Sequence, residues 1–173
     1  MQRFTKIFLM VVAISLICAI TPYAKAQNPL KVGYIELSKI FDEYKKTQDS
    51  SRALDEERKE KQAEMEKMVA ELNRLKDELE LLSEAGRKKK QAEIDEKTRK
   101  LSEFERESTV EIGSKRNAIM REILQEIDGV INEYGKAKNY DLILDDRFLL
   151  YQDESMDLTD ETIKILNSKY KGQ

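Results

Sequence analysis

One stretch decides the fold: residues 37–82, which read LSKIFDEYKKTQDSSRALDEERKEKQAEMEKMVAELNRLKDELELL. Residues that are mostly apolar or small recur in it alternately three and four positions apart, the period of a helix that keeps one face against a partner helix. We call these positions the seam: Leu37, Ile40, Tyr44, Thr47, Ser51, Leu54, Arg58, Lys61, Met65, Met68, Leu72, Leu75, Leu79 and Leu82. The stretch is therefore predicted to be one long helix that packs against a second helix.

The seam spacing fails after Leu82. Its continuation would hold one glycine and six charged residues, Gly86, Lys89, Glu93, Glu96, Lys100, Glu103 and Glu107. Because burying those charges in a dry interface is costly, the chain is expected to turn near residues 83–90, with Gly86 as a helix C-cap. The predicted fold is mostly α: a long antiparallel helical hairpin, or coiled-coil arm, on a small β-sheet body.

The returning helix supplies a predicted register. With the turn centred on Ala85 and Gly86, residues that face each other across the hairpin have numbers that sum to about 173. The expected partners are Leu79 with Ile94, Leu72 with Leu101, Val69 with Phe104, and Leu54 with Ile119. Limbs of about 45 residues would extend about 65 Å at the helical rise.

Apolar density changes along the returning helix, which runs to about Tyr134 with Gly135 expected to end it. Its later part carries a wide apolar stripe, as expected where a helix faces a globular core: Ile119, Met120, Ile123, Leu124, Ile127, Val130, Ile131 and Tyr134. We therefore assign residues 51–117 to the arm, and residues 27–50 and 118–173 to the body.

Short alternating segments predict the strands of the body. One covers residues 32–36, and two more cover residues 141–145 and 147–151. The candidate strand positions for the body, or for an interface between subunits, are Val32, Tyr34, Leu142 and Leu144. Ser38 is the expected N-cap of the long helix, and Thr159 is the expected N-cap of a last helix that buries Ile163, Ile165 and Leu166.

The first 26 residues have the pattern of a secretory signal peptide, with a basic start, an apolar run from Ile7 to Ile20, and an A-x-A site that places cleavage near Ala26. Removing it takes away Arg3, Lys6 and Lys25 and no carboxylate, so the net charge falls from −3 to −6. The mature chain then has no cysteine, which suits a bacterial envelope compartment, the periplasm, and leaves disulfides out of its stability. A body this small is expected to oligomerise.

The residue types present argue against several functions. Without histidine, mature cysteine or a phosphate-binding glycine loop, we expect neither an enzyme nor a bound cofactor. Five acidic residues near the C-terminus lack calcium-loop spacing, so we expect no metal site: Asp145, Asp146, Asp153, Glu154 and Asp157. The negative mature charge disfavours nucleic-acid binding.

Two groups of residues are candidate binding positions. Arg58, Lys61, Met65 and Met68 either pack within the seam or line a space that contacts an unfolded client protein. At the tip, the basic run of Arg87, Lys88, Lys89 and Lys90 is either a solvated turn or a surface for an anionic partner, such as lipopolysaccharide or phospholipid headgroups.

The two ends of the mature chain resemble a known family. The segments KVGYIELSKIF (residues 31–41), YDLILD (140–145), Tyr151 and DLTDETIKILN (157–167), on either side of a charged hairpin, are similar to the Skp/OmpH family of periplasmic chaperones. That resemblance implies a homotrimer whose three arms enclose unfolded outer-membrane β-barrel proteins without ATP. One departure is the acidic mature charge, because better-known members are strongly basic, and no lipopolysaccharide site can be matched residue by residue.

Two functions from different classes follow from these features. The first is a holdase chaperone that prevents aggregation by enclosing its client. The alternative is a passive structural or adaptor coiled coil that spaces or tethers components of the cell envelope and prefers a folded partner.

Overall fold

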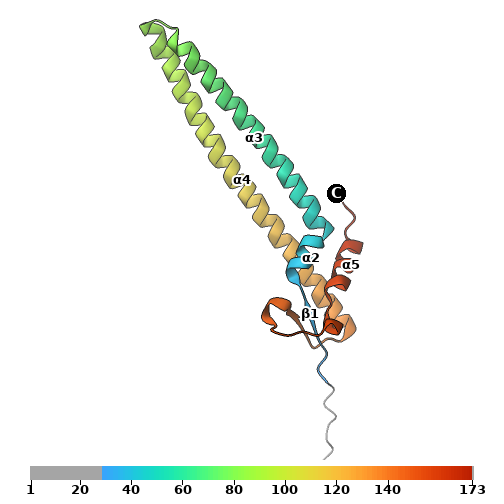
Figure 1. The fold of residues 1–173 in the computed structure, drawn as a ribbon. Helices are drawn as coiled ribbons and strands as arrows, with labels where there is room; N and C mark the ends of the chain where they lie inside the picture. Colours follow the sequence, from blue (N-terminus) through green and yellow to red (C-terminus); the bar gives the residue numbers. More distant parts are fainter. Residues whose placement is uncertain (1–28, 173) are drawn as a thin grey trace, which may run out of the picture. The chain divides into compact units, whose positions relative to one another are not determined.

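A computed structural model describes residues 29–172, so the predicted signal peptide at residues 1–26 lies outside the described residues. The elements in chain order are β1 (Val32–Ile35), α2 (Leu37–Glu43), α3 (Lys45–Glu80), α4 (Glu84–Lys138), β2 (Leu142–Asp145), two short 3-10 helices η2 (Asp146–Phe148) and η3 (Glu154–Met156), and α5 (Thr159–Lys169). Figure 1 shows α3 and α4 side by side as a hairpin that projects from the remaining elements. The predicted fold class, a helical hairpin on a small β-containing body, is confirmed.

The turn of the hairpin lies earlier than predicted. It occupies residues 81–83, and Gly86 lies inside α4 rather than capping a helix. Arg87 explains the difference, because its Nε donates a hydrogen bond to the Leu82 carbonyl at 2.9 Å and its Nη2 to the Glu80 carbonyl at 3.2 Å. These bonds satisfy carbonyls at the end of α3, so the helix ends without a glycine cap.

The predicted register is confirmed at two places in the arm. Near the tip, Leu72, Leu75 and Ile94 form a buried cluster against which Leu79 and Leu101 pack. Near the root, Leu54 and Ile119 line the same cavities. Val69 is 40% exposed, so it is not a buried partner of the kind expected for Phe104. Val69 lies one position beyond the seam residue Met68, so its side chain leaves the interface.

The long helix predicted from Leu37 is broken at Tyr44, which separates α2 from α3. Tyr44 has an extended backbone, with φ −69° and ψ 119°. Its ring is buried, and its hydroxyl donates to Glu126 Oε2 at 2.9 Å. Ser38 does not cap α2, because the cap position is Glu36, whose side chain makes no capping bond.

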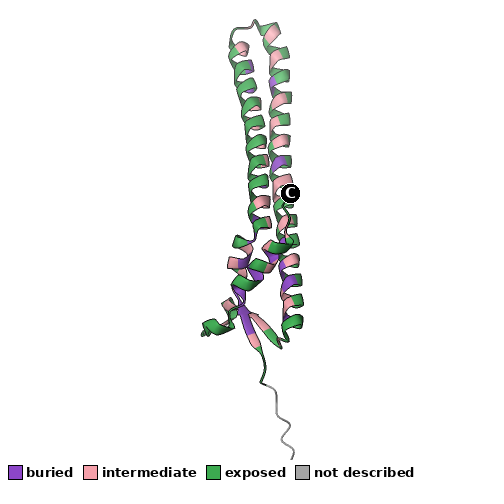
Figure 2. Cartoon of the chain, turned by 90° about the vertical axis from the view of Figure 1, so that its right-hand side faces the viewer, coloured by how far each residue is buried: buried purple, intermediate pink, exposed green. Residues whose placement is uncertain are grey.

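The core of the body is formed where α2, α5 and the last turns of α4 meet the strands. Its buried members are Ile35, Ile40, Tyr44, Ile123, Ile127, Val130, Leu158, Ile163 and Leu166. Figure 2 shows buried residues gathered in the body and only scattered along the arm. The density of apolar residues along the sequence predicted this difference.

Strands β1 and β2 form a parallel pair. The candidate strand positions face each other directly, with Val32 opposite Leu142 and Tyr34 opposite Leu144. Gly33 allows a close approach here, since a Cβ atom would lie 2.5 Å from Leu158 Cδ1. Strand β1 is also bridged to Asp157 on its other side.

Helix α4 continues beyond Gly135 and ends at Lys138, so the predicted helix end is wrong by one turn. Asn139 is the C-cap, with a left-handed φ of 55°. Gly135 serves a different purpose, because a Cβ atom there would lie 3.3 Å from Ile143 Cδ1. The glycine therefore lets β2 pass close to the last turn of α4.

The strand predicted at residues 147–151 is absent from the described chain, where residues 146–148 form η2 instead. Aspartate side chains explain this departure. Asp145, Asp153 and Asp157 each accept a hydrogen bond from the backbone N–H two residues later, at 3.1, 2.9 and 2.8 Å. Such local bonds compete with strand pairing. Asp157 also performs the capping role predicted for Thr159, whose own hydroxyl accepts from the Glu36 N–H at 2.9 Å.

Candidate functional site

The middle of the arm lacks the apolar packing found at its two ends. Helix α3 has no buried residue between Leu54 and Leu72, and α4 buries only Ser108 between Ile94 and Ile123. The sequence explains this gap, because the seam holds Arg58 and Lys61 at these turns and α4 contributes small and polar residues. The helices are therefore held together here mainly by charge pairs.

A groove of about 340 Å³ lies in this section. We call it the mid-arm groove; its lining residues are Arg58, Lys61, Gln62, Met65, Ser108, Thr109, Ile112, Gly113 and Arg116. Three of the four residues predicted to contact a client, Arg58, Lys61 and Met65, meet in it. Met68 is partly buried farther along α3 and is not among the lining residues.

The groove is framed by ion pairs across the hairpin. Lys61 Nζ lies 3.1 Å from Glu111 Oε2 and 5.5 Å from the centre of the Phe104 ring. Lys115 pairs with Glu111 at 2.9 Å and also with Glu57. Hydrogen bonds from Lys115 and Lys61 hold the pKa of the Glu111 carboxyl below its usual value. This carboxylate is therefore already paired with two lysines of the same hairpin.

The ion pairs that frame the groove do not include Arg116. Within residues 29–172 it makes no ion pair or side-chain hydrogen bond, and Arg58 is paired only with Asp55 on its own helix, at 3.3 Å. The groove thus combines apolar Met65 and Ile112 with an available guanidinium. Such a surface suits a chain segment with both apolar and acidic groups.

Sequence reasoning missed Arg116 and Ser108. Ser108 is 6% exposed, and its hydroxyl has no hydrogen-bond partner in the described chain. The hydroxyls of Thr98 and Thr109 on the same helix instead bond to backbone carbonyls of that helix, each at 2.8 Å. A signal was present: Ser108 lies on the α4 face that the predicted register turns toward Met65. A small polar residue at a buried position there indicates incomplete packing.

Arg116 also borders a second, smaller cavity at the root of the arm. This cavity measures about 150 Å³, and its lining includes Phe41, Thr47 and Leu54. The buried Thr47 hydroxyl likewise has no partner in the described chain. Arg116 therefore borders both cavities, and each cavity holds one buried hydroxyl without a partner in the described chain, Ser108 in the middle of the arm and Thr47 at its root.

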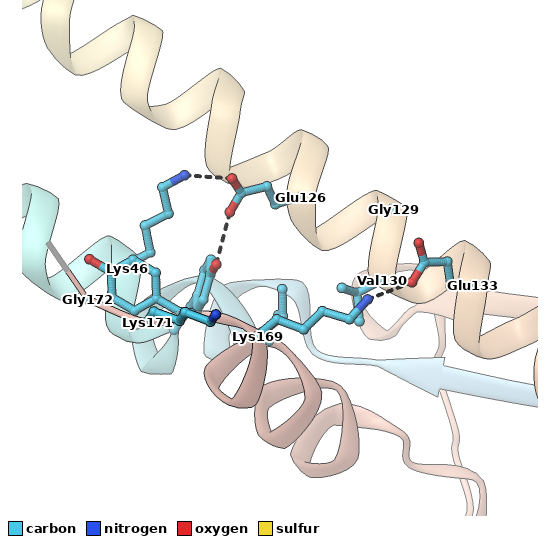
Figure 3. A pocket seen from close by; sticks show the side chains of 11 residues that line it. Lys46, Glu126, Gly129, Val130, Glu133, Lys169, Lys171 and Gly172 are labelled. Atoms are coloured by element: carbon cyan, nitrogen blue, oxygen red, sulfur yellow. Dashed lines mark hydrogen bonds and ion pairs between the residues drawn. The ribbon is translucent and has the colours of Figure 1, made fainter.

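A larger cavity of about 570 Å³ lies where α5 meets α3 and α4 (Figure 3). Four of the five charged side chains that line it are paired: Lys46 lies 2.6 Å from Glu126, and Lys169 lies 2.6 Å from Glu133. The fifth is Lys171. Bonds to Glu122 and Glu126 outweigh the burial of Lys46 and raise the pKa of its ammonium. Burial and the bond to Glu126 raise the pKa of Tyr44 to about 12. We interpret this cavity as a polar joint of the fold.

The basic tip is only partly available. Arg87 caps α3, and Lys90 pairs with Glu78 at 3.0 Å and with Glu93 at 3.3 Å. Lys88 and Lys89 are exposed, and neither has an ion pair within residues 29–172. Leu81, in the turn that precedes α4, is 87% exposed. The predicted four-residue cluster thus reduces to two lysines near an exposed leucine.

The acidic segment of the body is occupied by local bonds. The Asp145 carboxylate forms an ion pair with the Arg147 guanidinium at 2.6 Å. This pair holds the pKa of the Asp145 carboxyl at about 2. A search of the described residues finds no group of acidic side chains placed to hold a metal ion.

The same segment of the body, residues 145–157, exposes large apolar side chains, with Phe148 at 80% and Tyr151 at 86%. No helix in the described part of the chain has the length and hydropathy of a membrane span.

These features define the class of protein: a small α/β body that extends one long helical-hairpin arm with an incompletely packed middle. The chain belongs to the OmpH-like outer membrane protein family, whose model matches residues 31–166. The resemblance to the Skp/OmpH family is thereby confirmed.

A solved structure supports the fold. The chain is similar to an OmpH-like candidate chaperone of the outer membrane from Caulobacter crescentus CB15, with a TM-score of 0.77 and 14% sequence identity. The alignment covers 86% of this chain and 90% of that one. A search of curated proteins finds no match.

Proposed function

We propose that the protein is an ATP-independent periplasmic holdase that encloses unfolded outer-membrane β-barrel proteins between helical arms and prevents their aggregation. The observation that carries the proposal is the mid-arm groove, in a family that includes outer-membrane chaperones. Its mixture of thioether, aliphatic and guanidinium groups can contact many sequences without requiring one shape. A dry seam would present no such surface.

Enclosure requires more than one arm, and we propose that the body assembles three copies into a homotrimer. Two features support assembly. Phe148, Leu150 and Tyr151 are exposed in one segment of the body, and β2 pairs with β1 on one side only among the described strands. Exposed apolar side chains and an unpaired strand edge are both surfaces that other chains cover.

The decisive experiment dilutes a denatured outer-membrane β-barrel protein into buffer with and without this protein, and follows aggregation by light scattering. We expect suppression at one trimer per client, without ATP. Aggregation that proceeds unchanged at that ratio would overturn the proposal. Selective binding to a folded envelope protein, with no preference for unfolded chains, would instead support the adaptor alternative.

A second candidate function is contact between the arm tip and an anionic lipid surface, either phospholipid or lipopolysaccharide. Exposed Leu81 beside Lys88 and Lys89 supports it, since an apolar side chain with two lysines suits a negatively charged membrane interface. The test is sedimentation with vesicles that contain anionic lipid, comparing the protein with K88S/K89S. Undiminished binding by that double variant would remove the tip from consideration.

A further inference from the structure

The break between α2 and α3 has no local cause in the sequence. Residues 37–80 contain neither glycine nor proline, and the seam spacing runs through Tyr44 without interruption. Such a sequence favours one continuous helix. Figure 1 nevertheless shows α2 set at an angle to α3. The cause of the break must therefore lie in contacts with other elements.

A break in a helix frees backbone groups that need new partners. One side chain on α5 satisfies a group on each side of this break. The Lys45 N–H donates to Asn167 Oδ1 at 2.8 Å, and Asn167 Nδ2 donates to the Glu43 carbonyl at 3.2 Å. Gln48 adds a smaller contribution, because its Nε2 donates to the Asp42 carbonyl at 3.1 Å.

Helix α5 holds Asn167 in place through contacts of its own. Leu166 is buried in the core, and Asp160 accepts a hydrogen bond from Lys39 of α2 at 2.9 Å. One turn beyond Leu166, the Tyr170 ring meets the Tyr44 ring edge to face, with centroids 5.9 Å apart. The amide is thus presented to the break by a docked helix and does not reach it from a mobile tail.

We propose that Asn167 is a positioning residue that sets the angle at which the arm's first helix leaves the body. Helix α4 runs uninterrupted from the tip into the core, so α3 is the arm helix whose attachment depends on a joint. Burial of Ile40 and Tyr44 places α2 on the core. Asn167 then hydrogen-bonds to the two backbone groups that lose their helical partners, the Lys45 N–H and the Glu43 carbonyl. The inference does not depend on the chaperone function.

The first test measures the angle. Spin labels are placed on cysteines introduced at exposed Ser38 in α2 and exposed Ala63 in α3, in the chain from Gln27 onward, which has no other cysteine. Labelled chains are diluted into unlabelled protein, so that only distances within one chain are observed. A continuous helix would separate these positions by about 38 Å at the helical rise. We expect one narrow distribution at a shorter distance in the native chain, and a distribution at least twice as wide, extending toward 38 Å, in N167A.

The second test measures the hydrogen bonds. In N167A, hydrogen exchange at the Lys45 amide should accelerate about tenfold, the effect of losing one typical hydrogen bond. Exchange in the peptide that spans Ile123 to Val130 should stay unchanged. N167D keeps the acceptor for Lys45 but turns a carboxylate oxygen toward the Glu43 carbonyl. It should therefore retain protection at Lys45 while the distance distribution widens.

The matched control is N132A. Asn132 lies on α4, and among the described residues its side chain bonds only within its own helix, to the Asp128 carbonyl at 2.9 Å. If the distance distributions of N167A and N132A agree, Asn167 does not set the angle. Faster exchange throughout the body of N167A would likewise overturn the proposal, because the residue would then be a general stabiliser. If N167A fails to fold, N167D decides the question through its distance distribution.

Discussion

The ammonium of Lys61 lies 3.1 Å from the carboxylate of Glu111 on the opposite helix, at a seam position where a dry coiled coil would bury an apolar side chain. This pair joins the helices while leaving space beside Met65. The middle of the arm is therefore less densely packed and leaves a surface accessible that combines charged and apolar side chains.

Replacing Lys61 with leucine should close that space. We expect K61L to raise the free energy of unfolding by about 1 kcal/mol, because partial burial of leucine outweighs a pair near the surface. The same change should weaken suppression of client aggregation several-fold. Thermal unfolding followed by circular dichroism, together with the light-scattering assay, measures both effects. K59L, at an exposed position of α3, is the control; equal effects in both variants would contradict the prediction.

Arg116 should contribute to binding and little to stability. Since it has no ion pair in the described chain, R116A is expected to change the free energy of unfolding by less than about 0.5 kcal/mol. The affinity of R116A for an unfolded client should fall several-fold, as measured by fluorescence anisotropy of a labelled client. R121A removes another exposed arginine of α4 that has no ion pair within residues 29–172, and this variant should bind normally. A loss shared by both variants would indicate a general charge effect.

Ile94 should control the integrity of the tip. It is buried against Leu72 and Leu75, so I94A should cost about 2–5 kcal/mol of local stability. Hydrogen exchange should then accelerate in the outer turns of α3 and α4 while the body stays protected. L81A removes an exposed leucine from the same tip and should leave exchange unchanged. Uniform acceleration in I94A would show that tip and body unfold together.

Acid should loosen the arm. Hydrogen bonds from Lys97 and Lys90 lower the pKa values of Glu71 and Glu78, and Lys115 and Lys61 lower that of Glu111. A carboxyl whose pKa is lower in the folded state stabilises that state above its unfolded pKa, near 4.5, and loses this effect as pH falls through the folded value.

Helical content measured by circular dichroism should therefore be constant from pH 7 to about 5 and decrease below about 4.5. The double variant E71Q/E78Q removes two of these carboxylates, so its loss of helix below about pH 4.5 should be smaller. An identical acid profile in native protein and variant would assign the transition to other groups.

The exposed apolar segment of the body should control assembly. F148S/L150S/Y151S is expected to shift the mass in solution from trimer to monomer, because these side chains are at least 80% exposed and lose little packing within the described chain. Light scattering coupled to gel filtration measures the mass, and helical content serves as the check on folding. V110S, at an exposed apolar position of the arm, should leave the mass unchanged. A native chain that is already monomeric would remove the enclosure mechanism.

Several predictions failed where polar side chains bond to nearby backbone groups. Arg87 ends α3 early by bonding to its last carbonyls, so the turn comes before Gly86. Asp145 and Asp153 bind the backbone two residues ahead, so an apparently strand-like segment folds into short helical turns. These bonds depend on geometry that apolar periodicity does not report.

The candidate site was predictable only in part. Arg58, Lys61 and Met65 were identified because charged and flexible residues interrupt an apolar seam. Arg116 and Ser108 lie on the returning helix, so assigning them to the site requires the exact register between the two helices. A one-residue error in that register turns a helical residue by about 100° and changes which face it occupies. The structure supplies that register and brings all five residues to one groove.

The sequence by itself determined that two long helices pair in opposite directions, because a seam period that fails at one point can be satisfied only by turning back. It also indicated that the seam is interrupted by two charged residues, Arg58 and Lys61. Tertiary structure alone decided that the first helix breaks at Tyr44. No residue near Tyr44 opposes a continuous helix, and the freed backbone groups find their partner more than a hundred residues away, in Asn167.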